Sequence, residues 1–126
     1  MNEAKSEKIL YIGTCAGENP EKAAMPFVMA GAALAMDMEA VIALQGNGVY
    51  LAQKGYVEKM TKPGGFPPMV KLLKDFLELG GRLLVCVPCI KERNIDEKAD
   101  LVAGAATTAA GALNIEATES KAVFVY

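Results

Sequence analysis

Two cysteines separated by two residues are the part of this sequence best suited to chemistry. Cys86 and Cys89 form the tetrapeptide CVPC, which follows an apolar run and precedes Lys91 and Arg93. A thiolate is a strong nucleophile, and a helix N-terminus or a nearby cation lowers the pKa of a thiol. The pattern predicts catalytic thiols at positions 86 and 89, with Lys91 and Arg93 binding anionic substrates. The structural alternative is that both cysteines are small packing residues.

The absence of histidine limits the chemistry that this chain can perform. With no histidine in 126 residues, Ser-His-Asp catalysis, Cys-His catalysis and histidine-ligated metal sites are excluded. A zinc site needs four ligands, and Cys15 is the only further sulfur ligand besides the CVPC pair. We therefore expect no metal site and no cofactor.

Two more segments supply candidate substrate-binding residues. Cys15 follows the first apolar run, and Gly46 and Asn47 belong to a GNG turn that follows the second. The free N–H groups of such a turn are suited to binding a small anion. The GNG segment lacks the third glycine of a dinucleotide fingerprint, so its alternative role is that of a simple turn. For Cys15 the alternative is packing beneath the first helix.

Apolar runs and helical periodicity alternate along the chain. Strands are predicted over residues 9–12, 39–44, 82–87, 99–102 and 121–126. Helices are predicted over residues 20–36, from residue 68 to the glycines at 80 and 81, in a turn through 93, and over 105–113. This alternation is typical of an α/β fold in which helices cover both faces of a parallel sheet. Ligands bind such sheets at the carboxyl edge, where Cys15, Gly46 and Cys86 would lie.

Composition indicates one globular domain spanning residues 1–126. Hydrophobic residues make up 52% of the chain, and 13 basic against 15 acidic residues give a net charge of −2. We expect no nucleic-acid partner, because no basic run is present to neutralise phosphates. We expect no membrane span, because Pro26 and Asp37 interrupt the least polar segment.

Cysteine content and the start of the chain predict its compartment. Three cysteines do not make a secreted disulfide scaffold, and the polar start from Met1 to Lys8 does not read as an export signal. A cytoplasmic location is therefore expected. The predicted first helix is apolar on several sides, which favours burial against a neighbouring subunit.

Two segments resemble the DsrE/DsrF-like family, which includes the TusD-type sulfur relay subunits. They are GGRLLVCVPCIKERNI around the cysteine pair and ILYIGTCAGENPEKAAMPFVMAGAAL near the start. The resemblance implies a three-layer α/β/α fold with a five-stranded parallel sheet in the order 4-3-2-1-5. It also implies a homo-trimer or homo-hexamer, and Cys86 as the sulfur acceptor. Asn94 stands where the family usually has glycine, and asparagine tolerates the same left-handed backbone.

The resemblance predicts a sulfur carrier or sulfurtransferase-like protein that holds sulfane sulfur as a cysteine persulfide. Its partners would be sulfur donor and acceptor proteins or small sulfane-sulfur compounds. Two alternatives stay open at this point. One is a non-catalytic structural subunit of a sulfur-relay assembly, and the other is a CxxC dithiol redox protein. The sequence does not identify the donor, the acceptor or the pathway, whether sulfur oxidation or tRNA thiolation.

Overall fold

A sheet of five parallel strands forms the frame of the computed structural model, which describes residues 7–126. The strands are β1 (Lys8–Gly13), β2 (Glu39–Leu44), β3 (Arg82–Cys86), β4 (Ala105–Thr108) and β5 (Ala122–Val125). Their spatial order is β4-β3-β2-β1-β5. The predicted three-layer α/β/α fold and its strand order are therefore confirmed.

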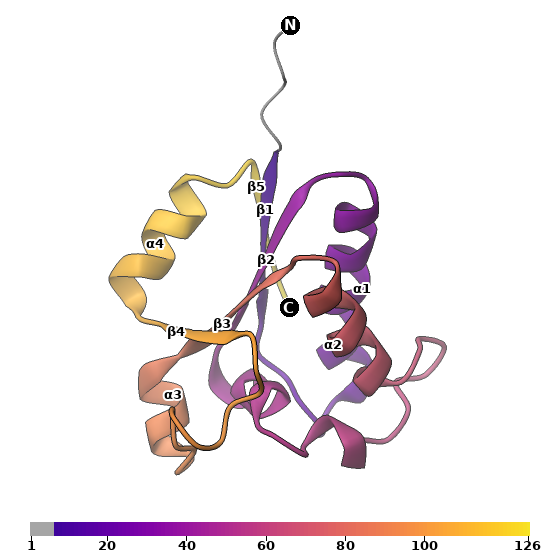
Figure 1. Ribbon diagram of the computed structural model, residues 1–126, viewed down its shortest axis with the longest axis vertical. Helices are drawn as coiled ribbons and strands as arrows, with labels where there is room; N and C mark the ends of the chain where they lie inside the picture. The colour runs from indigo at the N-terminus through magenta and orange to yellow at the C-terminus, as the bar shows by residue number, and fades with distance from the viewer. Residues whose placement is uncertain (1–6) are drawn as a thin grey trace, which may run out of the picture.

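Helices cover both faces of this sheet, as Figure 1 shows. They are α1 (Pro20–Ala35), α2 (Met69–Glu78), α3 (Val87–Glu92) and α4 (Ala110–Thr118), with the 3-10 segments η1 (Gly46–Ala52) and η2 (Val57–Lys59). In Figure 1, α1 and α2 lie on one face and α4 on the other. The segments α3 and η1 gather at the end of the sheet opposite the point where the chain enters β1. This end is the carboxyl edge of the parallel strands.

After their first residues, Lys8, Glu39 and Arg82, the central strands β1, β2 and β3 are largely apolar, because both faces of the sheet are covered. In β2 every residue after Glu39 is buried. The larger core lies between the sheet and the helices α1 and α2, where Phe27 and Phe76 meet edge to face with ring centroids 5.6 Å apart. The smaller core lies under α4 and includes Leu10, Val41, Ala43, Leu84 and Leu113.

The first helix begins where the sequence predicts. The side chain of Asn19 accepts a hydrogen bond from the backbone N–H of Lys22 at 3.2 Å, and Pro20 occupies the first helical position. Both features are favoured at a helix start, because the first N–H groups of a helix have no partner within it. The loop before α1, which carries Cys15, is thereby held at the carboxyl edge of β1.

Two predicted elements near the C-terminus are wrong. Residues 99–102 form no regular strand, and Leu101 makes only an isolated antiparallel bridge to Gln53. The helix predicted over residues 105–113 is divided into strand β4 and helix α4. The alanine-rich pattern has high helix propensity, but Gly104, with a φ of 95°, turns the chain into an extended segment. Pairing with β3 then overrides the local preference of residues 105–108.

The third strand also ends one residue earlier than predicted. It ends at Cys86, and Val87 already begins α3. The reason is Pro88, which has no N–H for a ladder and suits the first turn of a helix. Cys86 therefore stands at the junction of the strand and the helix, as the N-cap residue of α3.

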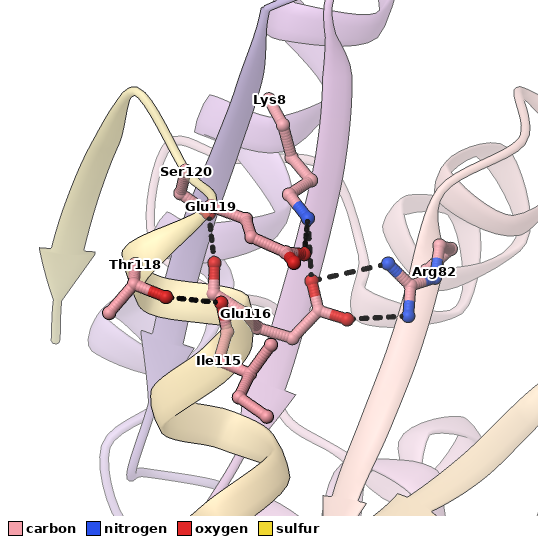
Figure 2. Close-up of polar contacts among 7 residues, drawn as sticks. All are labelled: Lys8, Arg82, Ile115, Glu116, Thr118, Glu119 and Ser120. Atoms are coloured by element: carbon pink, nitrogen blue, oxygen red, sulfur yellow. Dashed lines mark hydrogen bonds and ion pairs between the residues drawn. The ribbon is translucent and has the colours of Figure 1, made fainter.

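Helix α4 is fixed to the sheet by a polar cluster, drawn in Figure 2. Leu113 is its one buried residue among those described. Glu116 accepts hydrogen bonds from Lys8 Nζ at 3.0 Å and from both terminal nitrogens of Arg82, the shorter at 2.7 Å. Lys8 and Arg82 come from the starts of β1 and β3. The hydrogen bonds from Arg82 and Lys8 keep the pKa of Glu116 below its usual value, and partial burial opposes them.

Removing the charge of Glu116 is expected to destabilise the protein. In Glu116→Gln the free energy of unfolding at neutral pH should fall by roughly 1–3 kcal/mol, because two cations lose their shared carboxylate. The pKa of Glu116 is lower in the folded protein than in the unfolded chain, where it is about 4.3, so its carboxylate stabilises the fold above that pH. This stabilisation is lost as the pH falls through the pKa that Glu116 has in the folded protein. The difference in urea midpoint between wild type and variant should therefore shrink as the pH is lowered below about 4.

The matched control is Glu119→Gln, because Glu119 also pairs with Lys8 but is 62% exposed and 3.5 Å away. It should change the unfolding free energy by less than about 1 kcal/mol. Equal effects of the two substitutions at neutral pH would contradict the structural role of Glu116.

No helix within residues 7–126 has the length and apolar character that crossing a bilayer requires. Residues 1–6, which belong to the polar start considered for an export signal, lie outside the described part of the chain.

Candidate functional site

The two cysteines of the CVPC segment lie together at the carboxyl edge of the sheet. Cys86 is the last residue of β3, and Cys89 belongs to the first turn of α3. Both side chains are half-buried and neither forms a disulfide. Ile90 is buried and fixes α3 against the larger core. We refer to Cys86 and Cys89 as the thiol pair.

The GNG turn after β2 contacts the thiol pair directly. The backbone N–H of Gly46 donates a hydrogen bond to Cys89 Sγ over 3.2 Å. Gly46 has a φ of 54°, in the left-handed region that favours glycine. A backbone N–H directed at sulfur stabilises a thiolate, because it places positive partial charge beside the negative atom. The turn thus supplies one polar partner to the site from a neighbouring strand.

Arg93 connects the end of α3 to the same turn. Its Nε and Nη2 atoms donate to Asn47 Oδ1 at 3.2 and 3.0 Å, and Nη1 donates to the carbonyl of Cys89 at 3.1 Å. The guanidinium carbon lies 5.8 Å from the centroid of the Tyr50 ring, within cation–π range. Asn94, the next residue, has a φ of 57°. This lies in the left-handed region, which asparagine tolerates as glycine does. Arg93 is therefore held in place and acts on the thiols mainly through its charge.

The two thiols of the pair influence each other. Burial raises the pKa of the Cys86 thiol, and so does the hydrogen bond between the Cys86 and Cys89 side chains. The backbone N–H of Cys89 and the charge of Arg93 act in the opposite direction but do not cancel the rise. The backbone N–H of Gly46 lies against the other thiol of the pair, Cys89.

A third thiol lies in the loop after β1. Cys15 is half-buried and packs against the same core as the thiol pair. Glu18 folds back over this loop, and its Oε1 accepts the backbone N–H of Ala16 at 2.9 Å. Partial burial acts to raise the pKa of Glu18, but hydrogen bonds from the Ala16 and Glu18 N–H groups, the Asn47 side chain and the Cys15 thiol hold it below the usual value.

The structure brings together five of the seven residues that the sequence predicts for the site. Cys89, Gly46, Asn47 and Arg93 are joined by the contacts above, and Cys86 directly precedes α3. Cys15 lies in the loop after β1 and packs against the same core. Lys91 is exposed and is not part of this group of residues. It lines a cavity of about 390 Å³ with Ile95 and residues 96–98. Among the described residues, no group of three or more cysteine or acidic side chains is arranged to hold a metal ion.

Sequence reasoning missed Glu18 and Tyr50. A carboxylate three residues after a cysteine in a loop is a signal that could have identified Glu18, since that spacing lets the two side chains meet when the loop turns back. No comparable signal exists for Tyr50, whose place beneath Arg93 depends on how η1 packs against α3.

The DsrE/DsrF-like family model matches residues 7–126. Two curated relatives come from Methanocaldococcus jannaschii. The uncharacterized protein MJ0760 is 35% identical over 94 residues, 75% of this chain and 34% of that protein. The uncharacterized protein MJ0989 is 38% identical over 98 residues, 78% of this chain and 81% of that protein. The chain thus spans about a third of the first relative and about four fifths of the second.

Solved structures share the fold. The ychN protein from E. coli superposes with a TM-score of 0.78 and 16% identity, over 95% of this chain and 99% of its own. MTH1491 from Methanobacterium thermoautotrophicum superposes with a TM-score of 0.68 and 12% identity, over 97% of this chain and 100% of its own. At these identities the likeness concerns the arrangement of the chain alone.

Proposed function

The chain belongs to the DsrE/DsrF-like family, whose members are generally related to sulfur relay, and on that premise we propose that it is a sulfur carrier. The thiol pair takes a sulfane sulfur, holds it as a persulfide and passes it to a partner thiol. The observation that carries this proposal is the hydrogen bond from Gly46 N–H to Cys89 Sγ beside the Cys86 thiol. It gives the pair a place for one negative charge at the carboxyl edge of the sheet.

The proposed reaction is a thiol exchange at the outer sulfur of a donor persulfide. Cys86 sulfur attacks that atom, the sulfur–sulfur bond of the donor breaks, and the donor leaves as a thiolate. The proton of Cys86 passes to the departing thiolate, which is released as a thiol. The products are the reduced donor and a persulfide on Cys86, with no net oxidation. The charge of Arg93 favours the anionic forms that arise along this path.

Sulfur loading of the purified protein tests the proposal. After incubation with polysulfide and removal of the excess, intact mass should increase by one sulfur atom. Addition of a small thiol should remove that sulfur as persulfide on the acceptor. A protein whose thiols gain no sulfur under these conditions would contradict the proposal and favour the non-catalytic subunit.

Dithiol redox chemistry is the second candidate, because Cys86 and Cys89 stand three positions apart at the junction of β3 and α3. Oxidation would join them in a disulfide, as in other CxxC segments. Reduction of a model disulfide by the dithiol form, without any transfer of sulfur from polysulfide, is the result that would favour this candidate over the carrier.

The proposed partners are sulfur donor and acceptor proteins or small sulfane-sulfur compounds, and the proposed compartment is the reducing cytoplasm. All three cysteines of the chain are free thiols. Persulfide chemistry needs thiols that are not captured in disulfides, and reducing compartments keep them so.

Assembly into a trimer or hexamer is also part of the proposal. Met25, Val28 and Met29 of α1 line an open apolar cavity of about 290 Å³ together with Phe66 and Tyr126. Beside it, β5 is an edge strand whose Val125 is 67% exposed. A second copy of this chain would cover both apolar features at once, because they lie at the same edge of the sheet.

Light scattering at micromolar concentration is expected to give the mass of a trimer or a larger assembly. Met29→Glu should shift the mass toward the monomer, because it places a charge in the apolar contact. Val70→Glu is the matched control, since Val70 on α2 has the same exposure of 39% and is not among the residues that line this cavity. A monomeric wild type would contradict this assembly.

A further inference from the structure

Arg93 is a half-buried cation that has no carboxylate partner among residues 7–126. The other arginine of the chain, Arg82, pairs with Glu116 at 2.7 Å. Charges that a fold partly removes from water are usually paired with an opposite charge. The guanidinium of Arg93 therefore offers a place for an anion that the described part of the chain does not supply.

This guanidinium also keeps part of its hydrogen-bonding capacity. It carries five N–H groups. Nε and Nη2 each donate to Asn47 Oδ1, and Nη1 donates to the carbonyl of Cys89. One N–H on each of the two terminal nitrogens is left without an acceptor among the described residues. Two donors on neighbouring nitrogens match the two oxygens of a carboxylate.

Two stacked tyrosine rings hold the guanidinium in this position. The ring of Tyr50 lies 5.8 Å from the guanidinium carbon of Arg93, and the ring of Tyr56 stacks on it with centroids 5.4 Å apart. The Tyr56 hydroxyl in turn accepts the backbone N–H of Gly17 at 2.9 Å. A guanidinium that is already fixed loses little conformational freedom when an anion binds.

One turn places this cation beside the thiol pair. Gly46 donates its N–H to Cys89 Sγ at 3.2 Å, and the next residue, Asn47, accepts from Arg93 at 3.0 Å. Neighbouring Cα atoms are about 3.8 Å apart, so the guanidinium and the thiol pair lie within the length of a small molecule. A donor whose carboxylate binds to Arg93 can therefore present its sulfur to the thiol pair.

We propose that the two unused N–H groups of Arg93 bind a carboxylate of the sulfur donor, so that the protein prefers small persulfides that carry a carboxylate a few bonds from the sulfur. This inference rests on the proposed carrier function and adds the class of donor. Cys86 sulfur attacks the outer sulfur, the sulfur–sulfur bond of the donor breaks, and the donor leaves as a thiol with the Cys86 proton. The carboxylate stays on Arg93 and takes no part in these bond changes.

Two donors of equal length test the preference. They are the persulfides of 3-mercaptopropionate and of 3-mercaptopropionamide, which differ in the negative charge. Sulfur loading is followed by intact mass, and each rate constant is divided by that for the neutral thiol N-acetylcysteamine to correct for donor reactivity. The corrected rate constant of wild type should be at least about tenfold larger for the carboxylate donor, because hydrogen bonds to charged groups have effects of this size. Equal corrected rate constants would overturn the proposal.

Substitutions of Arg93 separate its two N–H groups from its charge. Lysine keeps the charge but does not offer two parallel N–H groups to one carboxylate. Most of the preference should therefore be lost in Arg93→Lys, and all of it in Arg93→Gln. Lys98→Gln removes an exposed cation elsewhere and is the matched control that should keep the preference. Full preference in Arg93→Lys, or any preference in Arg93→Gln, contradicts the carboxylate subsite.

Tyr50 is a positioning residue in this proposal, because it acts on the donor through Arg93. Tyr50→Phe keeps a ring against the guanidinium and should retain the preference. Tyr50→Leu removes the ring and should lower the preference by about threefold or more. Loading from the amide donor should not slow in Tyr50→Leu, whereas general damage to the fold would slow both donors. A wild-type preference in Tyr50→Leu would exclude the positioning role.

Polysulfide, which carries no carboxylate, separates this inference from the function on which it rests. Loading from polysulfide, together with equal corrected rate constants for the two persulfides, overturns the carboxylate subsite and leaves the carrier function intact. A protein that gains no sulfur from any of these donors overturns both.

Discussion

Replacing Cys86 by serine is expected to abolish sulfur loading of the thiol pair. Cys86 stands at the end of β3, where the strand delivers it to the carboxyl edge, and it is the N-cap residue of α3. Serine has the same shape but is not a nucleophile at neutral pH without a strong base. After incubation with polysulfide or tetrathionate, peptide mapping should find sulfur or thiosulfate adducts on Cys86 in wild type and none in Cys86→Ser.

The matched substitution, Cys89→Ser, is expected to have the opposite effect on the sulfur adduct at Cys86. The adduct on Cys86 should persist longer, because the thiol that releases it as sulfide is gone. Loading at neutral pH should not be slower than in wild type, because burial still raises the pKa of Cys86 but the contribution of Cys89 to that rise is gone. The loading rate should rise about tenfold per pH unit until that pKa is passed.

Two results would contradict these roles. If Cys86→Ser loads normally and Cys89→Ser does not, the two thiols exchange roles, and the hydrogen bond from Gly46 marks the acceptor. If neither cysteine of the wild type is modified, the cysteines are structural and the chain is the non-catalytic subunit of an assembly.

Replacing Gly48 by alanine is expected to separate the turn after β2 from the loop after β1. A Cβ atom at Gly48 would lie 2.9 Å from the Gly13 carbonyl carbon and closer still to its oxygen. These are backbone atoms, and the same oxygen accepts the N–H of Gln45 at 3.0 Å. One of the two segments must therefore move. We expect the free energy of unfolding to fall by about 2–3 kcal/mol, measured by urea denaturation.

The same substitution should also impair the site, because Gly48 directly follows Asn47, which accepts two hydrogen bonds from Arg93. Gly111→Ala in α4 is the matched control, since no atom lies within 4 Å of the added Cβ. Alanine there should stabilise the protein by about 0.5–1 kcal/mol through its higher helix propensity. Equal unfolding midpoints for Gly48→Ala and wild type would contradict the close contact between turn and loop.

Much of the fold could be predicted from residue patterns because their causes are local. The apolar runs that became β1, β2 and β3 are continuous, as strands covered on both faces require. The start of α1 could be placed because Asn19 and Pro20 satisfy local needs of a helix end. The prediction failed at residues 99–113, where alanine propensity indicated a helix and pairing with β3 imposed a strand. There the deciding contacts came from residues about twenty positions away.

The sequence by itself determined which groups are available for chemistry. It supplied three thiols without a histidine, set two of them at a spacing that shares one helical turn, and placed glycine where a turn must adopt a positive φ. These properties follow from residue types and short spacings. The family resemblance and the sheet order then located Cys86 at the carboxyl edge.

Only the tertiary structure decided how those groups act on one another. The N–H of Gly46 meets Cys89 43 positions further along the chain, and Arg93 meets Asn47 46 positions back. Such contacts arise because parallel strands bring their ends to one edge, where loops distant in sequence pack together. The same packing places the ring of Tyr50 beneath the guanidinium group of Arg93. The kinds of reactive side chain thus follow from the sequence alone, whereas the groups that contact them depend on the order of the strands in the sheet.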